Sequence, residues 1–140
     1  MKVKEVKSYL LNPGWGKNLL FVKIATDNGL VGWGECYTQS DRDKTIVTHL
    51  EHMSKYLKGR DPFEIKYFNQ IIFDDYASRR GSMEIFSALS GIEQALWDIC
   101  GKETKQPVYN LLGGPSRGKL RVYANGWYAG ALIPEDYAEK

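Results

Sequence analysis

The first 36 residues show the two-residue alternation of side chains that is typical of β-strands. This alternation covers residues 3–10, with mixed polarity, and residues 19–25 and 30–35. The stretches "NPGWGKN" and "DNG" separate the three segments, and Asn28-Gly29 favours a tight hairpin turn because both residues tolerate a positive φ. The pattern predicts a three-stranded antiparallel meander.

From residue 43 onward the apolar positions recur at steps of three and four, which indicates helices. Ser40 with Asp43 resembles a capping box, Asp61 before Pro62 predicts the start of a second helix that ends near Tyr76, and Ser82 predicts the cap of a third. The three apolar stripes are Ile46, Leu50, Met53 and Leu57; Ile65, Phe68, Ile71 and Ile72; and Ile85, Leu89, Ile92, Leu96 and Ile99.

Pro107 predicts a short fourth helix that ends at Leu112 before Gly113-Gly114-Pro115. The next segment, "KLRVYANGW" (residues 119–127), is expected to form a fourth strand, and "PEDYAEK" has the proline and acids of a helix start. A strand followed by a helix start is how a βα unit begins, so we expect an unfinished unit at Lys140. The fold class is α+β, a meander followed by a helical bundle.

Composition excludes several classes of partner. With 43% hydrophobic and 26% charged residues, the 140-residue chain suits one domain with its own core. The net charge of +2 is dispersed, so we expect no nucleic-acid partner. The chain has neither a signal-peptide core nor an apolar run near the roughly 18 residues of a membrane helix, which predicts a cytoplasmic protein without a membrane partner.

Few residues suggest metal or redox chemistry. Cys36 and Cys100 are far apart and match no metal-ligand spacing, so we expect free buried thiols. His49 and His52 have the spacing of a possible metal pair, but without a third ligand we interpret them as surface residues.

The apolar stretch "SGIEQALWDICGK" contains Glu93, Asp98 and Lys102. An acid–base site is one interpretation. However, the two acids are five residues apart, about 140° around a helix, so they do not converge. Asp98 and Lys102 have the spacing of an i,i+4 ion pair. We therefore favour polar edges of a core helix.

Residues 87–114, "SALSGIEQALWDICGKETKQPVYNLLGG", closely resemble the third-helix signature of the amino-terminal capping domain in the enolase superfamily, in its mandelate racemase/muconate lactonizing enzyme branch. "FVKIATDNGLVGWGE", "LKGRDPFEI" and "RRGS" resemble other parts of that domain, in order and spacing. The resemblance covers nearly all of residues 1–125. "GWGE" and "RRG" look most like acid-sugar dehydratases of the galactonate and mannonate type.

The resemblance implies a two-domain enzyme in which this α+β domain covers the mouth of a (β/α)₇β barrel. Residues 1–114 would be the capping domain, and residues 115–140 the first strand and the start of the first helix of a truncated TIM-type barrel. The barrel would hold Mg²⁺ and the general bases, so the family's catalytic and metal-binding residues are not in this chain.

By the same resemblance, the capping domain contributes loops that close over a substrate. "PGWGK" offers an aromatic side chain and a cation, and "ECYTQSD" offers Glu35, Tyr37 and Thr38. The planar guanidinium group of an arginine can bind a carboxylate through two hydrogen bonds. Active-site residues of barrel enzymes lie at the carboxyl ends of the barrel strands. The candidates are Trp15, Lys17, Tyr37, Arg79, Arg80, Asn125 and Tyr128. An exposed hairpin loop and a solvated turn are the alternatives for the first loop and for the two arginines.

Two hypotheses follow from the sequence. In the first, the chain is the amino-terminal part of an Mg²⁺-dependent lyase or isomerase, an acid-sugar dehydratase that removes a proton next to a carboxylate and forms homo-oligomers. Its substrate would be an acid sugar or another small carboxylate, and the barrel its missing partner domain. In the second, the chain is a stand-alone module for binding or dimerisation that has no catalytic activity.

Overall fold

The computed structural model describes residues 1–14, 16–125 and 129–138. The first three elements are strands β1 (Val3–Leu11), β2 (Leu19–Thr26) and β3 (Val31–Cys36), which form an antiparallel sheet in the order β1-β2-β3. The predicted meander is therefore confirmed. The turn between β2 and β3 has a positive φ at Gly29 alone (90°).

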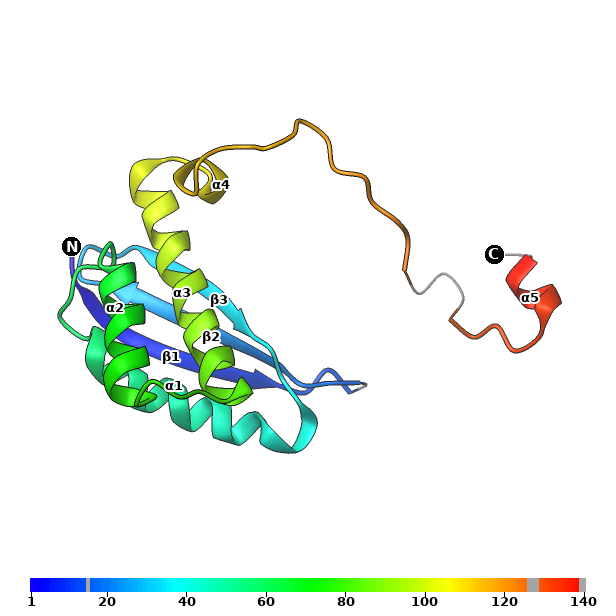
Figure 1. The fold of residues 1–140 in the computed structure, drawn as a ribbon, viewed down its shortest axis with the longest axis horizontal. Helices are drawn as coiled ribbons and strands as arrows, with labels where there is room; N and C mark the ends of the chain where they lie inside the picture. The colour runs from blue at the N-terminus through cyan, green and yellow to red at the C-terminus, as the bar shows by residue number, and fades with distance from the viewer. Residues whose placement is uncertain (15, 126–128, 139–140) are drawn as a thin grey trace.

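Helices cover one face of this sheet (Figure 1). The α3 helix packs on β3 and β2, α1 packs beside β1, and α2 packs against α3. No helix in the described part of the chain is long and apolar enough to cross a membrane. The elements after β3 are the 3₁₀-helix η1 (Ser40–Arg42), α1 (Asp43–Leu57), α2 (Ile65–Ile71), the π-helix η2 (Ile72–Tyr76), α3 (Met83–Thr104), α4 (Val108–Leu111) and α5 (Pro134–Ala138).

The core lies between the sheet and the helices. Alternate residues of β2, Leu20, Val22 and Ile24, are fully buried because one face of the strand points at the helices. The helical stripes meet this face through the buried side chains of Ile46, Leu50, Met53, Leu57, Ile65, Phe68, Ile72, Leu89, Ile92, Leu96 and Ile99. The periods of two and of three to four residues thus identified most of the core, whereas Ile71 and Ile85 of the predicted stripes are half-buried at its margin.

Glycines allow α3 to approach β3 closely. A Cβ atom on Gly34 would lie 2.0 Å from the carbonyl oxygen of Gly91, and one on Gly32 would lie 2.1 Å from that of Ala95. A Cβ atom on Gly91 would in turn meet the Sγ atom of Cys36 at 2.3 Å. The backbones of strand and helix therefore touch where side chains would normally separate them.

Because α3 lies so close, its side chains form hydrogen bonds with the backbone N–H and C=O groups along the open edge of β3. Helix residues four apart advance about 6 Å, close to the spacing of alternate strand residues, so a row of three polar side chains follows the strand. The bonds join the Gln94 side chain to Glu35 N–H and C=O (both 3.1 Å), Asp98 to Trp33 N–H (2.9 Å) and Lys102 to Val31 C=O (2.7 Å). A sheet edge that would otherwise attract other strands is thereby covered.

These bonds decide between the two interpretations of the polar residues in α3. Asp98 and Lys102 pair with each other at 2.7 Å, and both bind the backbone of β3. Glu93 accepts a bond from Trp97 Nε1–H at 3.4 Å. The structural interpretation of the three residues is therefore confirmed.

Two helix starts differ from the prediction. The α1 helix begins at Asp43 after a 3₁₀ turn, and the side chain of Ser40 lies outside what the structure describes. The α2 helix begins at Ile65 rather than Pro62, because the Asp61 carboxylate accepts the N–H of Phe63 at 3.0 Å and so forms a turn of its own. In contrast, Ser82 caps α3 as predicted, accepting Ile85 N–H at 3.3 Å.

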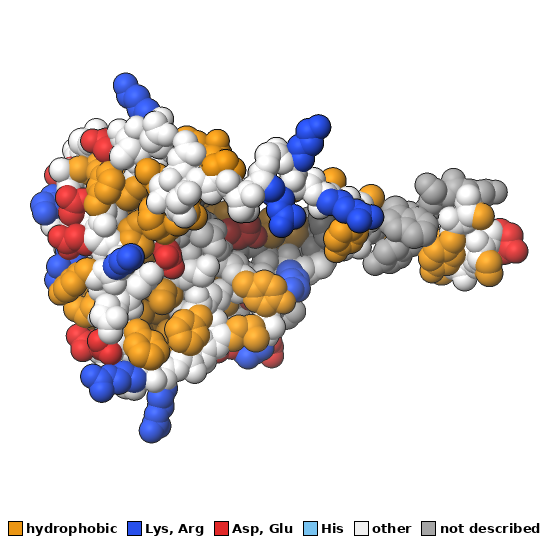
Figure 2. Space-filling view, turned by 45° about the horizontal axis from the view of Figure 1, so that its top comes forward, with side chains coloured by type: hydrophobic (Ala, Val, Ile, Leu, Met, Phe, Trp, Pro, Cys, Tyr) orange, Lys and Arg blue, Asp and Glu red, His pale blue; other side chains and the backbone are white. Residues whose placement is uncertain are grey.

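The predicted strand over residues 119–127 is not present in its described part, residues 119–125. Its apolar side chains are exposed, with Val122 and Tyr123 each 84% accessible. A strand needs a neighbour, and this segment pairs with neither edge of the three-stranded sheet, where α3 side chains already occupy the open edge of β3. The segment instead extends away from the folded body, where Figure 2 shows apolar and basic side chains along it. The helix start at Pro134 is confirmed as α5.

Both cysteines are free and buried, as predicted. Burial raises the pKa of the Cys36 thiol to about 12 and that of Cys100 to about 11. We expect neither thiol of the folded chain to react with an aromatic disulfide reagent within an hour at pH 8, because the thiolate is the nucleophile. In urea both should react within minutes. Rapid modification of one thiol per folded chain would contradict this expectation.

Candidate functional site

Three connecting segments lie toward one end of the domain (Figure 1), and the first two of them are in contact. They are the β1–β2 loop (residues 12–18), the segment after β3 (residues 37–39) and the loop before α3 (residues 77–82). Because β1 and β3 run in the same direction, both finish at this end, and α1 and α3 begin there. The topology therefore gathers the predicted substrate loops, which are up to 70 residues apart in sequence, at one end.

Lys17 and Tyr37 form the contact between the first two segments. The Lys17 ammonium donates to the Tyr37 phenol oxygen at 2.8 Å and lies 4.1 Å from the ring centroid. The Lys17 hydrogen bond lowers the pKa of the phenol, with Gln39 adding to the effect. Tyr37 is 56% exposed, and it borders a hollow of about 270 Å³ that Ser90 and Gln94 also line. The pair thus presents a cation and a polarised hydroxyl to solvent.

Buried polar residues beneath this pair hold the two segments together. The Asp43 carboxylate, in a residue only 2% exposed, accepts bonds from the Asn18 side chain and from Gln39 N–H, each at 2.8 Å. Thr38 Oγ1 donates to Asn18 C=O, and Ser87 Oγ donates to Tyr37 C=O at 2.7 Å. Sequence reasoning assigned no role here to Asn18 or Ser87. The sequence signal that could have revealed this network is a polar residue, Asp43, at a core-facing position of a helix.

The loop before α3 is held by contacts of its own. Arg79 has a positive φ of 59°, and its Nε donates to Asp74 at 3.2 Å. Gln70, and after it Arg79, lower the pKa of the Asp74 carboxyl by hydrogen bonding. Arg80 is exposed. Both arginines thus lie in the loop that leads into α3, and Arg79 is bound to Asp74 of the π-helix η2 rather than to Tyr37.

The remaining candidates are Trp15, Asn125 and Tyr128. Trp15 and Tyr128 are outside the described residues. Asn125 is exposed in the segment after α4. The structure brings only Lys17 and Tyr37 of the candidate residues into described contact. Glu35, at the end of β3, is held through its backbone by Gln94.

No group of three metal-ligating side chains occurs among the described residues. His52 is exposed as expected, whereas His49 is half-buried and its Nδ1 lies 2.6 Å from the Tyr76 hydroxyl. Burial lowers the pKa of His49. His49 is thus only partly at the surface, since its ring packs against Tyr76 at the end of η2. A resident metal does not fit the described residues.

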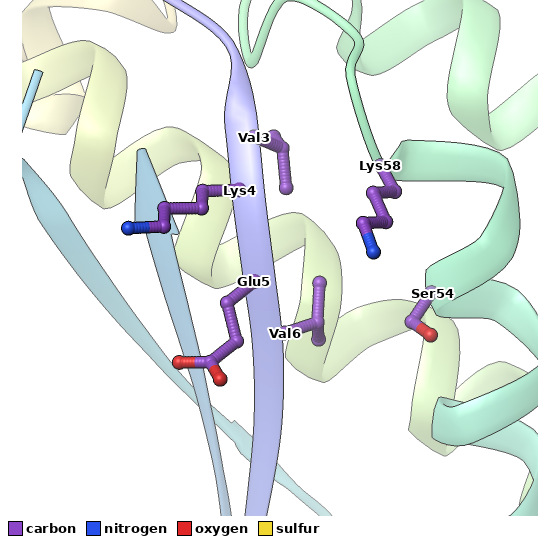
Figure 3. Close-up of a pocket in the computed structure, with 6 residues that line it drawn as sticks. All are labelled: Val3, Lys4, Glu5, Val6, Ser54 and Lys58. Carbon is purple, nitrogen blue, oxygen red and sulfur yellow. The ribbon is translucent and has the colours of Figure 1, made fainter. Parts of the chain in front are cut away.

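A larger hollow, of about 410 Å³, lies at the opposite end of the sheet. Figure 3 shows Val3 and Val6 of β1 facing Ser54 and Lys58, while Lys4 and Glu5 point away from them. The start of β1 meets the end of α1 here, where Val3 N–H donates to Arg60 C=O at 2.8 Å. This hollow is a seam between β1 and α1, remote from the three segments.

The fold and the gathered loops together define an α+β domain of the capping class, with a polar loop end and without a metal centre in its described residues. The family described as "Mandelate racemase / muconate lactonizing enzyme, N-terminal domain" matches residues 16–113. The chain belongs to this family.

Similar proteins agree with this assignment. The D-galactonate dehydratase of Pectobacterium atrosepticum is 41% identical over 130 residues, which are 93% of this chain and 32% of that enzyme. The corresponding enzyme of Cronobacter sakazakii is 38% identical over the same shares. The chain thus spans about a third of the length of the curated relatives it matches.

Solved structures show the same fold. A protein from Mesorhizobium loti, provisionally described as a dehydratase, has a TM-score of 0.86 at 36% identity and covers 99% of this chain and 37% of its own. An enolase from Agrobacterium radiobacter, provisionally described as a galactarate dehydratase and bound to Na and L-malate, has a TM-score of 0.79 at 32% identity. The match covers 88% of this chain and 30% of the Agrobacterium protein.

Proposed function

We propose that this chain is the substrate-capping portion of an Mg²⁺-dependent acid-sugar dehydratase. The observation that carries the proposal is the Lys17–Tyr37 pair at the loop end. Two galactonate dehydratases among the relatives support a polyhydroxylated carboxylate as substrate, and a similar structure that binds malate supports a small hydroxycarboxylate. The metal ligands and the bases would belong to a barrel domain, because the described residues hold no metal-binding group.

In this proposal the chain's own residues bind and enclose the substrate. An ammonium group has three N–H donors, and Lys17 directs one of them at Tyr37, so two remain for a carboxylate or for hydroxyls. The exposed Tyr37 phenol can donate a hydrogen bond to a sugar oxygen. Closing such groups over a site positions the substrate and excludes water.

Further parts of the proposal concern the whole protein. We place the boundary between the capping domain and the barrel start at residues 114 and 115, next to Gly113 and Gly114, whose φ angles are positive. We also propose that the whole protein forms a homo-oligomer in the cytoplasm. The two free buried thiols agree with a reducing compartment.

A domain exchange tests the proposal. Residues 1–114 would replace the corresponding domain of the Pectobacterium D-galactonate dehydratase, and Mg²⁺-dependent dehydration of D-galactonate would be assayed. We expect measurable turnover by the chimera and none by the 140-residue chain alone. A well-folded chimera without turnover on a panel of sugar acids would contradict the proposal, and tight binding of a sugar acid by the isolated chain would then favour the stand-alone module.

Within this chimera we expect Lys17→Met to reduce kcat/KM about tenfold, mainly through a higher KM. The reason is the loss of one charge-assisted hydrogen bond, and tenfold corresponds to about 1.4 kcal/mol. Lys55→Met is the matched control, because Lys55 is exposed in the last turn of α1, at the opposite end of the domain. Equal kinetics for the two variants would remove Lys17 from the substrate site.

A further inference from the structure

Asp43 is a buried carboxylate in a domain whose other acids are exposed or partly exposed. Each of its oxygens accepts one bond at 2.8 Å, Oδ2 from the Asn18 side chain and Oδ1 from Gln39 N–H. Burying an ion costs free energy unless hydrogen bonds compensate it, and these bonds come from two different segments. The carboxylate thus crosslinks the end of the β1–β2 loop to the segment after β3.

We propose that Asp43 is a positioning residue, whose carboxylate holds residues 16–18 and 37–39 in the one arrangement that pairs Lys17 with Tyr37. Asn18 directly follows Lys17, and Gln39 lies two residues after Tyr37. The bond from Thr38 Oγ1 to Asn18 C=O adds a second link between the same segments. The importance of this arrangement for substrate binding rests on the proposed function.

The chemistry of this position requires a carboxylate. Both partners are N–H donors, so the side chain must accept at both oxygens, which an ionised aspartate does and an asparagine does not. Asp43 is also the first residue of α1, where the helix dipole favours a negative charge. In Asp43→Asn, one end of the side chain would direct an NH₂ group at an N–H donor, and one crosslink would be lost.

The test uses the 140-residue chain with ¹³Cζ-labelled tyrosine, and follows the pKa of Tyr37 by NMR. Tyr37→Phe assigns the signal, and Lys17→Met gives the value without the pair. In Asp43→Asn we expect the pKa of Tyr37 to rise to the Lys17→Met value, because the loops no longer hold the ammonium group against the phenol. Asp41→Asn, at an exposed acid two residues away, should keep the wild-type value.

The outcomes separate positioning from simple stabilisation of α1. If Asp43→Asn lowers the free energy of unfolding but leaves the pKa of Tyr37 at the wild-type value, the proposal is overturned. If Asp43→Asn does not fold, Asn18→Ala replaces it, since it removes one crosslink without changing a residue of α1, and the same rise in the pKa of Tyr37 is expected. If Asp43→Asn shifts the pKa of Tyr37 but leaves KM unchanged in the chimera, Asp43 still positions the two segments. That result would count against the proposed function alone.

Discussion

Replacing Gly34 by alanine is expected to lower the free energy of unfolding by at least about 3 kcal/mol. The added Cβ atom would lie 2.0 Å from the carbonyl oxygen of Gly91 and 3.0 Å from the amide nitrogen of Ala95. Overpacking commonly costs about 1–3 kcal/mol, and this case should exceed it because the clash is with backbone that cannot rotate away. Moving α3 outward would also break the bonds of Gln94 to Glu35.

Urea unfolding followed by circular dichroism measures this effect. Gly118→Ala is the control, since nothing lies within 4 Å of a Cβ atom there, and we expect a change within about 0.5 kcal/mol. A Gly34→Ala variant as stable as this control would mean that α3 does not rest on β3 as closely as described.

The second large effect is expected for Phe68→Ala. Phe68 is fully buried, and phenylalanine-to-alanine changes in cores cost about 3–5 kcal/mol through lost burial and the cavity that remains. Domains of this size have total stabilities of about 5–15 kcal/mol, so this loss removes a large share of the total stability and should lower the melting temperature markedly. Thermal unfolding of the purified variant measures the change.

Phe73→Ala provides the comparison for this substitution. Phe73 lies in the π-helix that continues α2, and it is 40% exposed, so its removal should cost less than about 1 kcal/mol. Equal losses at positions 68 and 73 would contradict the assignment of the α2 face that enters the core.

The sequence predicted the fold where local pattern and burial coincide. Leu20, Val22 and Ile24 alternate in the sequence and are buried together in the structure. The stripe of α3 was equally readable. The bonds of Gln94, Asp98 and Lys102 to the edge of β3 were not, because they depend on how closely two elements approach. Glycines in a strand indicate that another backbone approaches closely, but they do not identify the element that approaches.

The candidate site was only partly readable for a similar reason. Lys17 and Tyr37 were each proposed from loop position, but their pairing depends on the register of the meander. Asp43 was interpreted as part of a capping box, and its carboxylate instead crosslinks two loops. The strand pattern of residues 119–125 could not show that this segment pairs with neither edge of the sheet.

The meander also keeps the strand pairing of the domain independent of the loop that carries Lys17. Residues 12–18 connect two strands whose register continues up to Leu11 and Leu19, so the loop adds nothing to the strand pairing beneath it. Lengthening a surface loop costs little free energy, about 0.6 kcal/mol for each doubling. The length of this loop can therefore change at little cost to the fold, provided that Asn18 keeps its bond to the buried Asp43 carboxylate.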